Sequence, residues 1–149
     1  MTITVNQPEK VNAVEGQKFD SDPERRFAVM LEDEEATEVQ KWFRPDLSRF
    51  SIRRNNGENY FPDFVVETTD MKYICEVKAD DKANDPDVVD KWNAAVAWCE
   101  VVSAAERAAG RKEWRYVFVK ESQIDAAMTF NVAAAKFVET SKRDVGKIR

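Results

Sequence analysis

The spacing of hydrophobic residues changes along the chain between the period of a helix and that of a strand, and this pattern predicts its elements. Helical spacing is found in a segment that begins at Asp22, in the long segment from Pro86 to Gly110, and in a last segment from Ser122 to about Ser141. Residues 39–43 suit either a short helix or a strand. Runs rich in β-branched and aromatic residues predict strands at 50–54, 60–68, 72–79 and 114–120.

Capping residues at the ends of two helices support the assignment. Ser21 is predicted as an N-cap, and Glu24 three residues later completes a capping box. That helix is expected to end within or just beyond the acidic stretch 32–35. Pro86 fits the first turn of the long helix, and Gly110 fits the position just past its end.

The order of the elements predicts how the strands pair. Turn signals at 55–57 and 69–71 join the first three strands into an antiparallel meander. The long helix forms a crossover, so the fourth strand should lie parallel to the third. We expect an α/β (α+β) fold with a four-stranded mixed β-sheet flanked by helices, in the order αβββαβα. Residues 1–20 are predicted as a flexible segment, 21–141 as the folded domain and 142–149 as a charged tail.

Three charged residues occupy the second and third predicted strands, where burial is expected. Asp63 stands at the start of one strand, and Glu76 and Lys78 are two residues apart in the next. If Thr69 pairs with Lys72, Asp63 lies opposite Lys78 and all three charged side chains share one face of the sheet. Burying such charges is unfavourable unless they are paired or bind a metal ion. The other face is apolar and is expected to pack under the long helix through Phe64, Val66, Cys75 and Val77.

The composition narrows the chemistry open to these residues. The 149 residues include no histidine, which excludes histidine-dependent nucleases and Ser-His-Asp or Cys-His hydrolases. The two cysteines, Cys75 and Cys99, are too few for a four-ligand zinc site. Carboxylates favour hard cations such as Mg²⁺, with Mn²⁺ as a substitute. Two carboxylates that share such a cation beside Lys78 would form a site for phosphodiester hydrolysis.

These residues also resemble a known nuclease motif. Pro62-Asp63 followed by Glu76-Val77-Lys78 resembles the PD-(D/E)xK signature, on the matching order of helices and strands. The flanking sequences DPERRFAVMLED, VQKWF, RFSI and KWNAAVAWCE resemble the C-terminal endonuclease domain of type III restriction enzymes (the Res subunit).

The resemblance implies a Mg²⁺-dependent DNA endonuclease with a restriction-endonuclease-like core. Asp63, Glu76 and Lys78 match its catalytic positions. Asp63 and Glu76 would hold the metal together with Glu24 on the first helix, although the capping box also accounts for Glu24. DNA is the expected substrate, with a 5′-phosphate product, and a helicase or translocase region and a methyltransferase subunit are candidate partners. The sequence has no Walker A loop, so we expect either an excised domain or a stand-alone relative.

Further candidates and alternatives stay open. Arg53, Arg54 and Lys91 are candidate DNA contacts, and Tyr60 and Glu67 lie near the motif. The net charge of −5 gives no overall attraction to DNA. The alternatives are a catalytically silent DNA-binding or protein-docking module on the same fold, and a resolvase-, transposon- or RNA-cleaving relative. A cytoplasmic location without membrane contact is expected, because no apolar signal segment or membrane-length apolar run is found.

Overall fold

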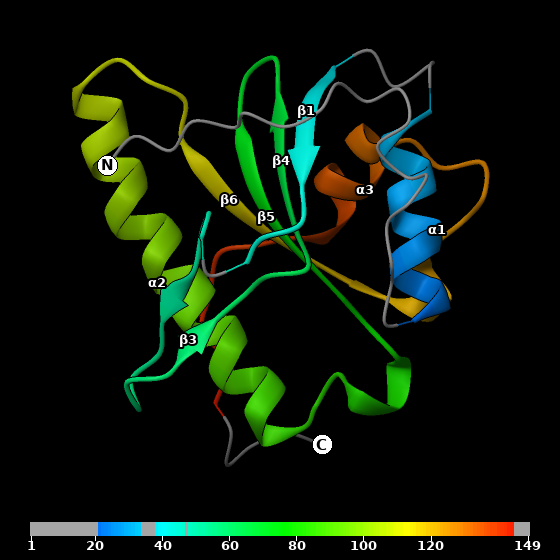
Figure 1. The fold of residues 1–149 in the computed structure, drawn as a ribbon, viewed down its shortest axis with the longest axis horizontal. Helices are drawn as coiled ribbons and strands as arrows, with labels where there is room; N and C mark the ends of the chain where they lie inside the picture. The colour runs from blue at the N-terminus through cyan, green and yellow to red at the C-terminus, as the bar shows by residue number, and fades with distance from the viewer. Residues whose placement is uncertain (1–20, 34–37, 47, 145–149) are drawn as a thin grey trace.

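The computed structural model describes residues 21–33, 38–46 and 48–144, and within these ranges five strands form one mixed β-sheet between helices (Figure 1). The predicted fold class is confirmed, with one more strand than expected. The sheet runs in the order β1 (Val39–Phe43), β4 (Phe64–Thr68), β5 (Lys72–Lys78), β6 (Trp114–Lys120) and β7 (Val138–Glu139). The helices are α1 (Asp22–Leu31), α2 (Pro86–Ala108) and α3 (Phe130–Phe137), with short 3₁₀ turns at Asp80–Lys82 and Glu121–Gln123.

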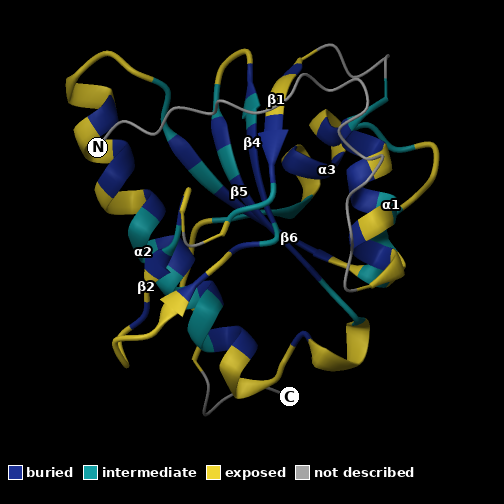
Figure 2. Cartoon of the chain, in the orientation of Figure 1, coloured by how far each residue is buried: buried dark blue, intermediate teal, exposed yellow. Residues whose placement is uncertain are grey.

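Each face of the sheet is covered by different helices, so the domain has two hydrophobic cores. Helix α2 covers one face, where Val65 and Ile74 pack in one buried cluster with Trp92. Helices α1 and α3 cover the other face, where the rings of Phe27 and Phe64 lie 5.0 Å apart. Figure 2 shows the strands buried between these layers.

The prediction that the apolar face of the hairpin packs under the long helix is wrong. Phe64, Val66, Cys75 and Val77 all belong to the core beneath α1 and α3. The long helix therefore covers the face that carries Glu76, whose neighbour Ile74 packs in the α2 core. Side chains alternate along a strand, so the pattern separates two faces but does not tell which helix covers each.

The ends of the helices follow the capping signals. Ser21 caps α1 by accepting a hydrogen bond from the Glu24 backbone, as predicted. The expected end within or beyond 32–35 is wrong, because the helix already ends at Leu31. Gly110 follows α2 with φ of 73°, and its N–H bonds to the Arg107 carbonyl at 3.1 Å. The next N–H, of Arg111, bonds to the Glu106 carbonyl at 2.9 Å, which completes a Schellman motif.

The predicted three-stranded meander is wrong. Residues 39–43 form strand β1, which pairs antiparallel with β4 at the edge of the sheet. The expected strand at 50–54 is reduced to β2 (Ile52–Arg53), which pairs with β3 (Asn59–Tyr60) in a separate two-stranded sheet. The expected strand at 60–68 is divided because Pro62, which has no N–H to donate, separates β3 from β4.

The C-terminal part also differs from the prediction of one helix from Ser122 to Ser141. Ser122 lies in a 3₁₀ turn, and α3 begins eight residues later with Thr129 as its N-cap. The chain then returns to the sheet as β7, antiparallel to β6, whereas β6 lies parallel to β5 as predicted. The described part of the predicted tail is attached to α2, since the Arg143 N–H donates to Asn93 at 2.7 Å.

The domain limits proposed from the sequence are only partly within the described residues. The segment 1–20 and the positions 145–149 lie outside them. No helix in the described part of the chain combines the length and the apolar character needed to cross a membrane.

Candidate active site

The hairpin of β4 and β5 brings the predicted site residues together, although its register differs from the predicted one. Glu67 pairs with Lys72 and Phe64 with Cys75, a shift of two residues from the pairing of Thr69 with Lys72. A shift of two leaves every side chain on its own face, whereas a shift of one would exchange the faces. Asp63 consequently comes opposite Glu76, one step beyond the last pair.

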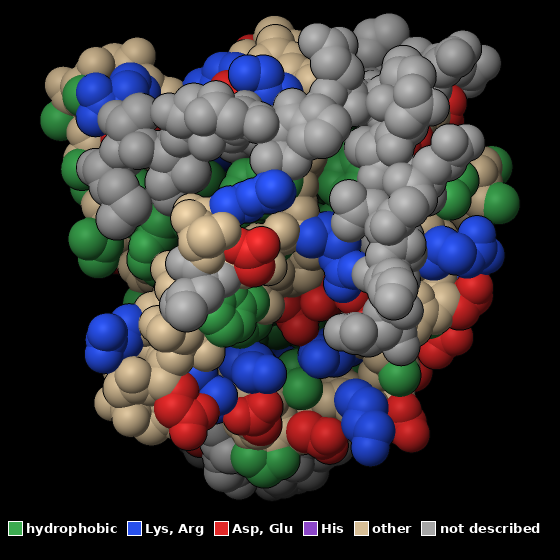
Figure 3. All heavy atoms as spheres, viewed as in Figure 1, with side chains coloured by type: hydrophobic (Ala, Val, Ile, Leu, Met, Phe, Trp, Pro, Cys, Tyr) green, Lys and Arg blue, Asp and Glu red, His purple; other side chains and the backbone are tan. Residues whose placement is uncertain are grey.

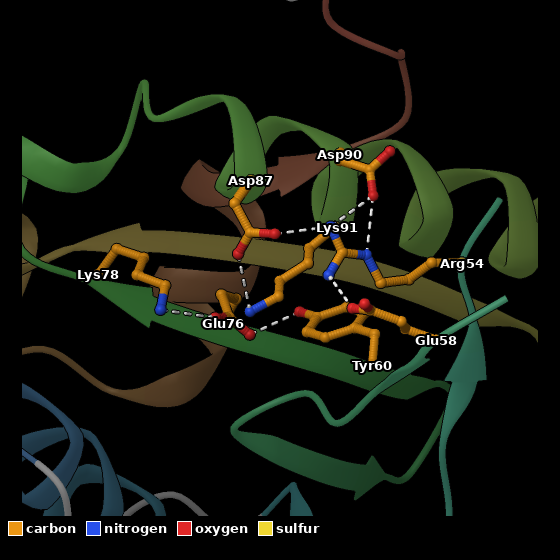
Figure 4. Close-up of polar contacts among 8 residues, drawn as sticks. All are labelled: Arg54, Glu58, Tyr60, Glu76, Lys78, Asp87, Asp90 and Lys91. Carbon is orange, nitrogen blue, oxygen red and sulfur yellow. Dashed lines mark hydrogen bonds and ion pairs between the residues drawn. The ribbon is translucent and has the colours of Figure 1, made fainter. Parts of the chain in front are cut away.

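Glu76 is the buried centre of this group. It lies on β5 with 4 % of its surface exposed. Its Oε1 accepts a hydrogen bond of 2.5 Å from the Tyr60 hydroxyl, and its Oε2 lies 3.4 Å from Lys78 Nζ (Figure 4). Burial raises the pKa of Glu76, while Lys78 and the Tyr60 hydrogen bond act in the opposite direction.

Asp63 is held at the end of the same hairpin by a backbone hydrogen bond. The Val77 N–H donates to its Oδ2 at 2.8 Å, which fixes the carboxylate beside the strand that carries Glu76. Burial, followed by the charges of Glu76 and Glu24, raises the pKa of Asp63 well above its usual range. Glu76, on β5, and Glu24, on α1, therefore both act on the carboxylate of Asp63, which directly precedes β4.

Lys78 is the cation of this group. Burial lowers its pKa, but Glu76 and then Asp63 raise it by more, so that the net pKa lies above the ordinary value. In the absence of a metal ion Lys78 is therefore protonated at neutral pH and balances part of the negative charge.

Glu24 combines the two roles considered from the sequence. Its backbone N–H completes the capping interaction with Ser21, and its Oε2 accepts a hydrogen bond of 3.1 Å from the Ser21 hydroxyl. Its Oε1 forms an ion pair of 2.6 Å with Arg44, which follows β1. Its charge also contributes to the raised pKa of Asp63, so Glu24 acts electrostatically on the site while it pairs with Arg44.

The three candidate DNA contacts have different surroundings. Lys91 forms an ion pair of 3.2 Å with Asp87, and its ammonium group lies 5.8 Å from the centre of the Tyr60 ring. Arg54 is buried against carboxylates of α2, which gives it a structural role, whereas Arg53 is exposed on β2. Their contact with DNA stays a prediction. On the face seen in Figure 3, acidic side chains lie among lysine and arginine side chains.

The site residues fit a hard cation in their chemistry, but not as a preassembled cage. Within 21–33, 38–46 and 48–144, no three Asp, Glu, Cys or His side chains are grouped closely enough to hold a metal ion as they stand. Asp63 and Glu76 nevertheless repel each other, and a divalent cation is the partner that relieves such repulsion between oxygen ligands. Asp63, Glu76 and Glu24 are the groups that would hold it.

The sequence did not predict the contacts that two residues make in the site, Tyr60 with Glu76 and Arg44 with Glu24. Tyr60 is only a minor candidate from the sequence, because nothing in its spacing shows that β3 forms a separate small sheet and brings the Tyr60 hydroxyl to Glu76. Arg44 was not a candidate at all, and its position after a strand gives no signal of its ion pair with Glu24. Glu67, the other minor candidate, pairs with Lys112 at 2.8 Å at the far end of the hairpin.

The fold, the candidate site and the comparison with protein families indicate the same class of protein. A mixed sheet between helices, with two acids and a lysine at adjacent strand ends, is consistent with a nuclease-related domain of the restriction-endonuclease-like PD-(D/E)xK superfamily. Residues 33–121, more than half of the chain, match the family described as "TnsA-like endonuclease N terminal", and the chain belongs to this family. The predicted resemblance to type III restriction enzymes is not shown by this match. No curated protein and no solved structure gives a significant match to the chain.

Proposed function

We propose that this domain is a Mg²⁺-dependent DNA endonuclease that hydrolyses phosphodiester bonds and leaves a 5′-phosphate. Asp63 and Glu76 hold the metal ion, with Glu24 as a third acidic group. The observation that carries the proposal is the contact of 3.4 Å between Lys78 Nζ and Glu76 Oε2, beside the fixed carboxylate of Asp63. This places a cation next to the two acids that would bind the metal.

The roles of the side chains follow from their charges. A bound divalent ion would polarise the scissile phosphate and lower the pKa of a water molecule. Lys78, protonated by its acidic neighbours, orients that water and stabilises the negative charge that develops on the phosphate oxygens. Asp63 is kept in place by the Val77 N–H, so its carboxylate needs little reorganisation when the ion binds.

The family favours one of the biological settings considered from the sequence. Membership in the TnsA-like family supports a transposon-associated role, which was one of the alternatives to a restriction-type system. The helicase region and the methyltransferase subunit belong to the restriction interpretation and have no support from the family match. DNA is the substrate class that a nuclease-like domain of this family would act on.

Cleavage of supercoiled plasmid DNA by the purified chain tests the proposal. With Mg²⁺ or Mn²⁺ the wild-type chain should nick or linearise the plasmid, and EDTA should stop it. Glu76→Gln and Asp63→Asn should abolish cleavage. Glu67→Gln is the matched control, because it makes the same change on the same hairpin at a residue that pairs with Lys112.

Metal binding separates an active site from a silent module. Calorimetric titration with Mn²⁺ should show binding to the wild-type chain and to Glu67→Gln, but not to Asp63→Asn. Binding of DNA without metal binding or cleavage would instead support the catalytically silent alternative.

A further inference from the structure

Tyr60 connects the small β2–β3 hairpin to the buried carboxylate of the site. It is the last residue of β3, only 2 % of its surface is exposed, and its hydroxyl donates to Glu76 Oε1 at 2.5 Å. Phe61 and Pro62 then lead the chain to Asp63. A tyrosine hydroxyl is rarely buried without a partner, and here its partner is a proposed metal ligand.

The hydrogen bond restricts how Glu76 can use its two oxygens. With Oε1 held by Tyr60, Oε2 is the oxygen that faces Lys78, 3.4 Å away (Figure 4). Without the hydroxyl, the carboxylate would be free to turn, and either oxygen would face Lys78. Groups that hold metal ligands in one orientation raise both metal affinity and activity.

The hairpin that carries Tyr60 is itself fixed by a buried arginine. Arg54, directly after β2, has only 8 % of its side chain exposed. Its guanidinium bonds to Asp87 at 2.6 Å and to Asp90 at 2.8 Å, both in the first turns of α2, and a weaker contact of 3.5 Å reaches Glu58 (Figure 4). One arginine thus joins the turn of the hairpin to the helix.

Lys91 completes the connection between the helix and the tyrosine. It pairs with Asp87 at 3.2 Å and lies over the Tyr60 ring at 5.8 Å. Figure 4 shows two groups of polar contacts, one that joins Arg54 and Lys91 to Asp87 and one that joins Tyr60 to Glu76. The two groups meet where the ammonium group of Lys91 lies over the Tyr60 ring.

We propose that Tyr60 is a positioning residue that fixes the orientation of Glu76 for metal binding, and that the ion pairs of Arg54 with Asp87 and Asp90 hold Tyr60 in place. This inference rests on the proposed nuclease function. The β2–β3 hairpin is then a support of the active site, and its ion pairs act on the metal site through Tyr60.

The variant Tyr60→Phe removes only the hydroxyl, and Tyr73→Phe makes the same change on the opposite face of the sheet. Mn²⁺ affinity is measured by calorimetry without DNA, and the single-turnover cleavage rate is measured over a series of Mg²⁺ concentrations. Tyr60→Phe should weaken Mn²⁺ binding about tenfold and raise the Mg²⁺ requirement by a similar factor. The affinity for DNA should remain close to that of Tyr73→Phe, whereas the unfolding temperature should fall, because a buried oxygen of Glu76 loses its donor.

The variant Arg54→Lys tests the second part of the proposal, with Arg107→Lys as an exposed control. Arg54→Lys should change metal affinity in the same direction as Tyr60→Phe but by less. The double variant Tyr60→Phe/Arg54→Lys should be no weaker than Tyr60→Phe alone, because both changes act through one hydroxyl. Fully additive effects would overturn the role of the arginine.

The possible failures can be told apart with Glu76→Gln in the same assays. If Tyr60→Phe and Tyr73→Phe bind Mn²⁺ equally and Glu76→Gln does not bind it, the inference about Tyr60 is wrong and the proposed function stands. If Glu76→Gln equals the wild-type chain in binding and cleavage, the proposed function is wrong, and the inference fails with it.

Discussion

At the scale of single residues, the acidic groups around Glu76 determine the protonation state of Lys78. One oxygen accepts from Tyr60 at 2.5 Å and the other faces Lys78 at 3.4 Å. Asp63 and Glu24 add negative charge, and this charge keeps Lys78 protonated despite its partial burial. In the proposed reaction, a lysine in this state would supply positive charge and would not accept a proton.

Replacing Lys78 by methionine should separate catalysis from metal binding. The variant Lys78→Met removes the charge with little change in length, so the single-turnover cleavage rate should fall by about 10²–10³, as for the loss of one charge-stabilising donor. Mn²⁺ affinity should be unchanged or higher, because a cation that competes for Glu76 is gone. Lys136→Met, an exposed change on α3, is the control. A loss of metal binding in Lys78→Met would contradict this role.

At the scale of elements, helix α2 contributes to the site at one end and to stability at the other. Its first turns carry Asp87, Asp90 and Lys91, which face the β2–β3 hairpin. Its last turn ends in the Schellman motif that directs the chain into β6. Because β6 pairs in parallel with β5, the end of this helix also helps to fix the strand that carries Glu76.

The C-terminal cap of α2 should be sensitive to the residue at position 110. The φ of 73° at Gly110 is unfavourable for residues that have a Cβ atom. The cost comes from the backbone conformation alone, since no neighbouring atom lies where the Cβ atom would be. Gly110→Ala should therefore lower the free energy of unfolding by about 1 kcal/mol. Gly110→Asn should lower it less, since asparagine tolerates this conformation. Urea unfolding of the two variants measures the difference, and equal stability of Gly110→Ala and the wild-type chain would contradict it.

At the scale of the whole molecule, buried acids make the metal-free fold less stable than its packing alone would allow. Asp63 and Glu76 both have raised pKa values, with burial as the largest cause. The charged forms are therefore disfavoured by folding. A bound cation or a neutral replacement of one acid should relieve this cost.

Metal binding should therefore stabilise the wild-type chain but not the Asp63→Asn variant. At a Mg²⁺ concentration a hundredfold above the dissociation constant, the gain for the wild-type chain should be about 2.7 kcal/mol. In EDTA, Asp63→Asn should be the more stable protein, because asparagine can accept the same hydrogen bond from Val77 without a charge. Thermal unfolding with EDTA and with Mg²⁺ gives both comparisons. A metal-dependent gain in Asp63→Asn equal to that of the wild-type chain would refute the assignment.

The metal-free protein should also lose stability as the pH rises. An acid whose pKa is higher in the folded protein than in the unfolded chain contributes most below its unfolded pKa, and this contribution is lost as the pH rises toward the folded pKa. For Asp63 the loss begins near 3.8, the ordinary value. In EDTA, the free energy of unfolding of the wild-type chain should therefore fall relative to Asp63→Asn as the pH rises from that value. Urea unfolding at several pH values measures this trend, and the opposite slope would contradict it.

Much of the site could be predicted from the sequence because its signals are local. Pro62-Asp63 and Glu76-Val77-Lys78 lie within a single hairpin, and the alternation of the strands keeps Glu76 and Lys78 on one face in any register. An error of two residues in the register did not separate them from Asp63. The capping residues Ser21 and Gly110 were also predicted correctly, since each interaction spans only a few residues.

The pairing of distant segments could not be predicted in the same way. The edge strand β1 occupies the place expected for 50–54. Part of the segment predicted as the third helix, 122–141, forms strand β7 instead. Both depend on which segment fits the sheet edge, and short strands with similar composition compete for that place. The helix that covers each face is likewise decided by the packing of whole layers.

By itself the sequence determined the class of the fold, the start of α1, both ends of α2 and the three charged residues of the hairpin as candidates. These follow from periodicity, from capping residues and from the absence of histidine. Only the tertiary structure decided that Tyr60 bonds to Glu76, that Arg54 is an internal ion-pair partner, and that Glu24 acts on Asp63. Such contacts join residues 16 to 39 positions apart, and their partners become neighbours only when the layers pack.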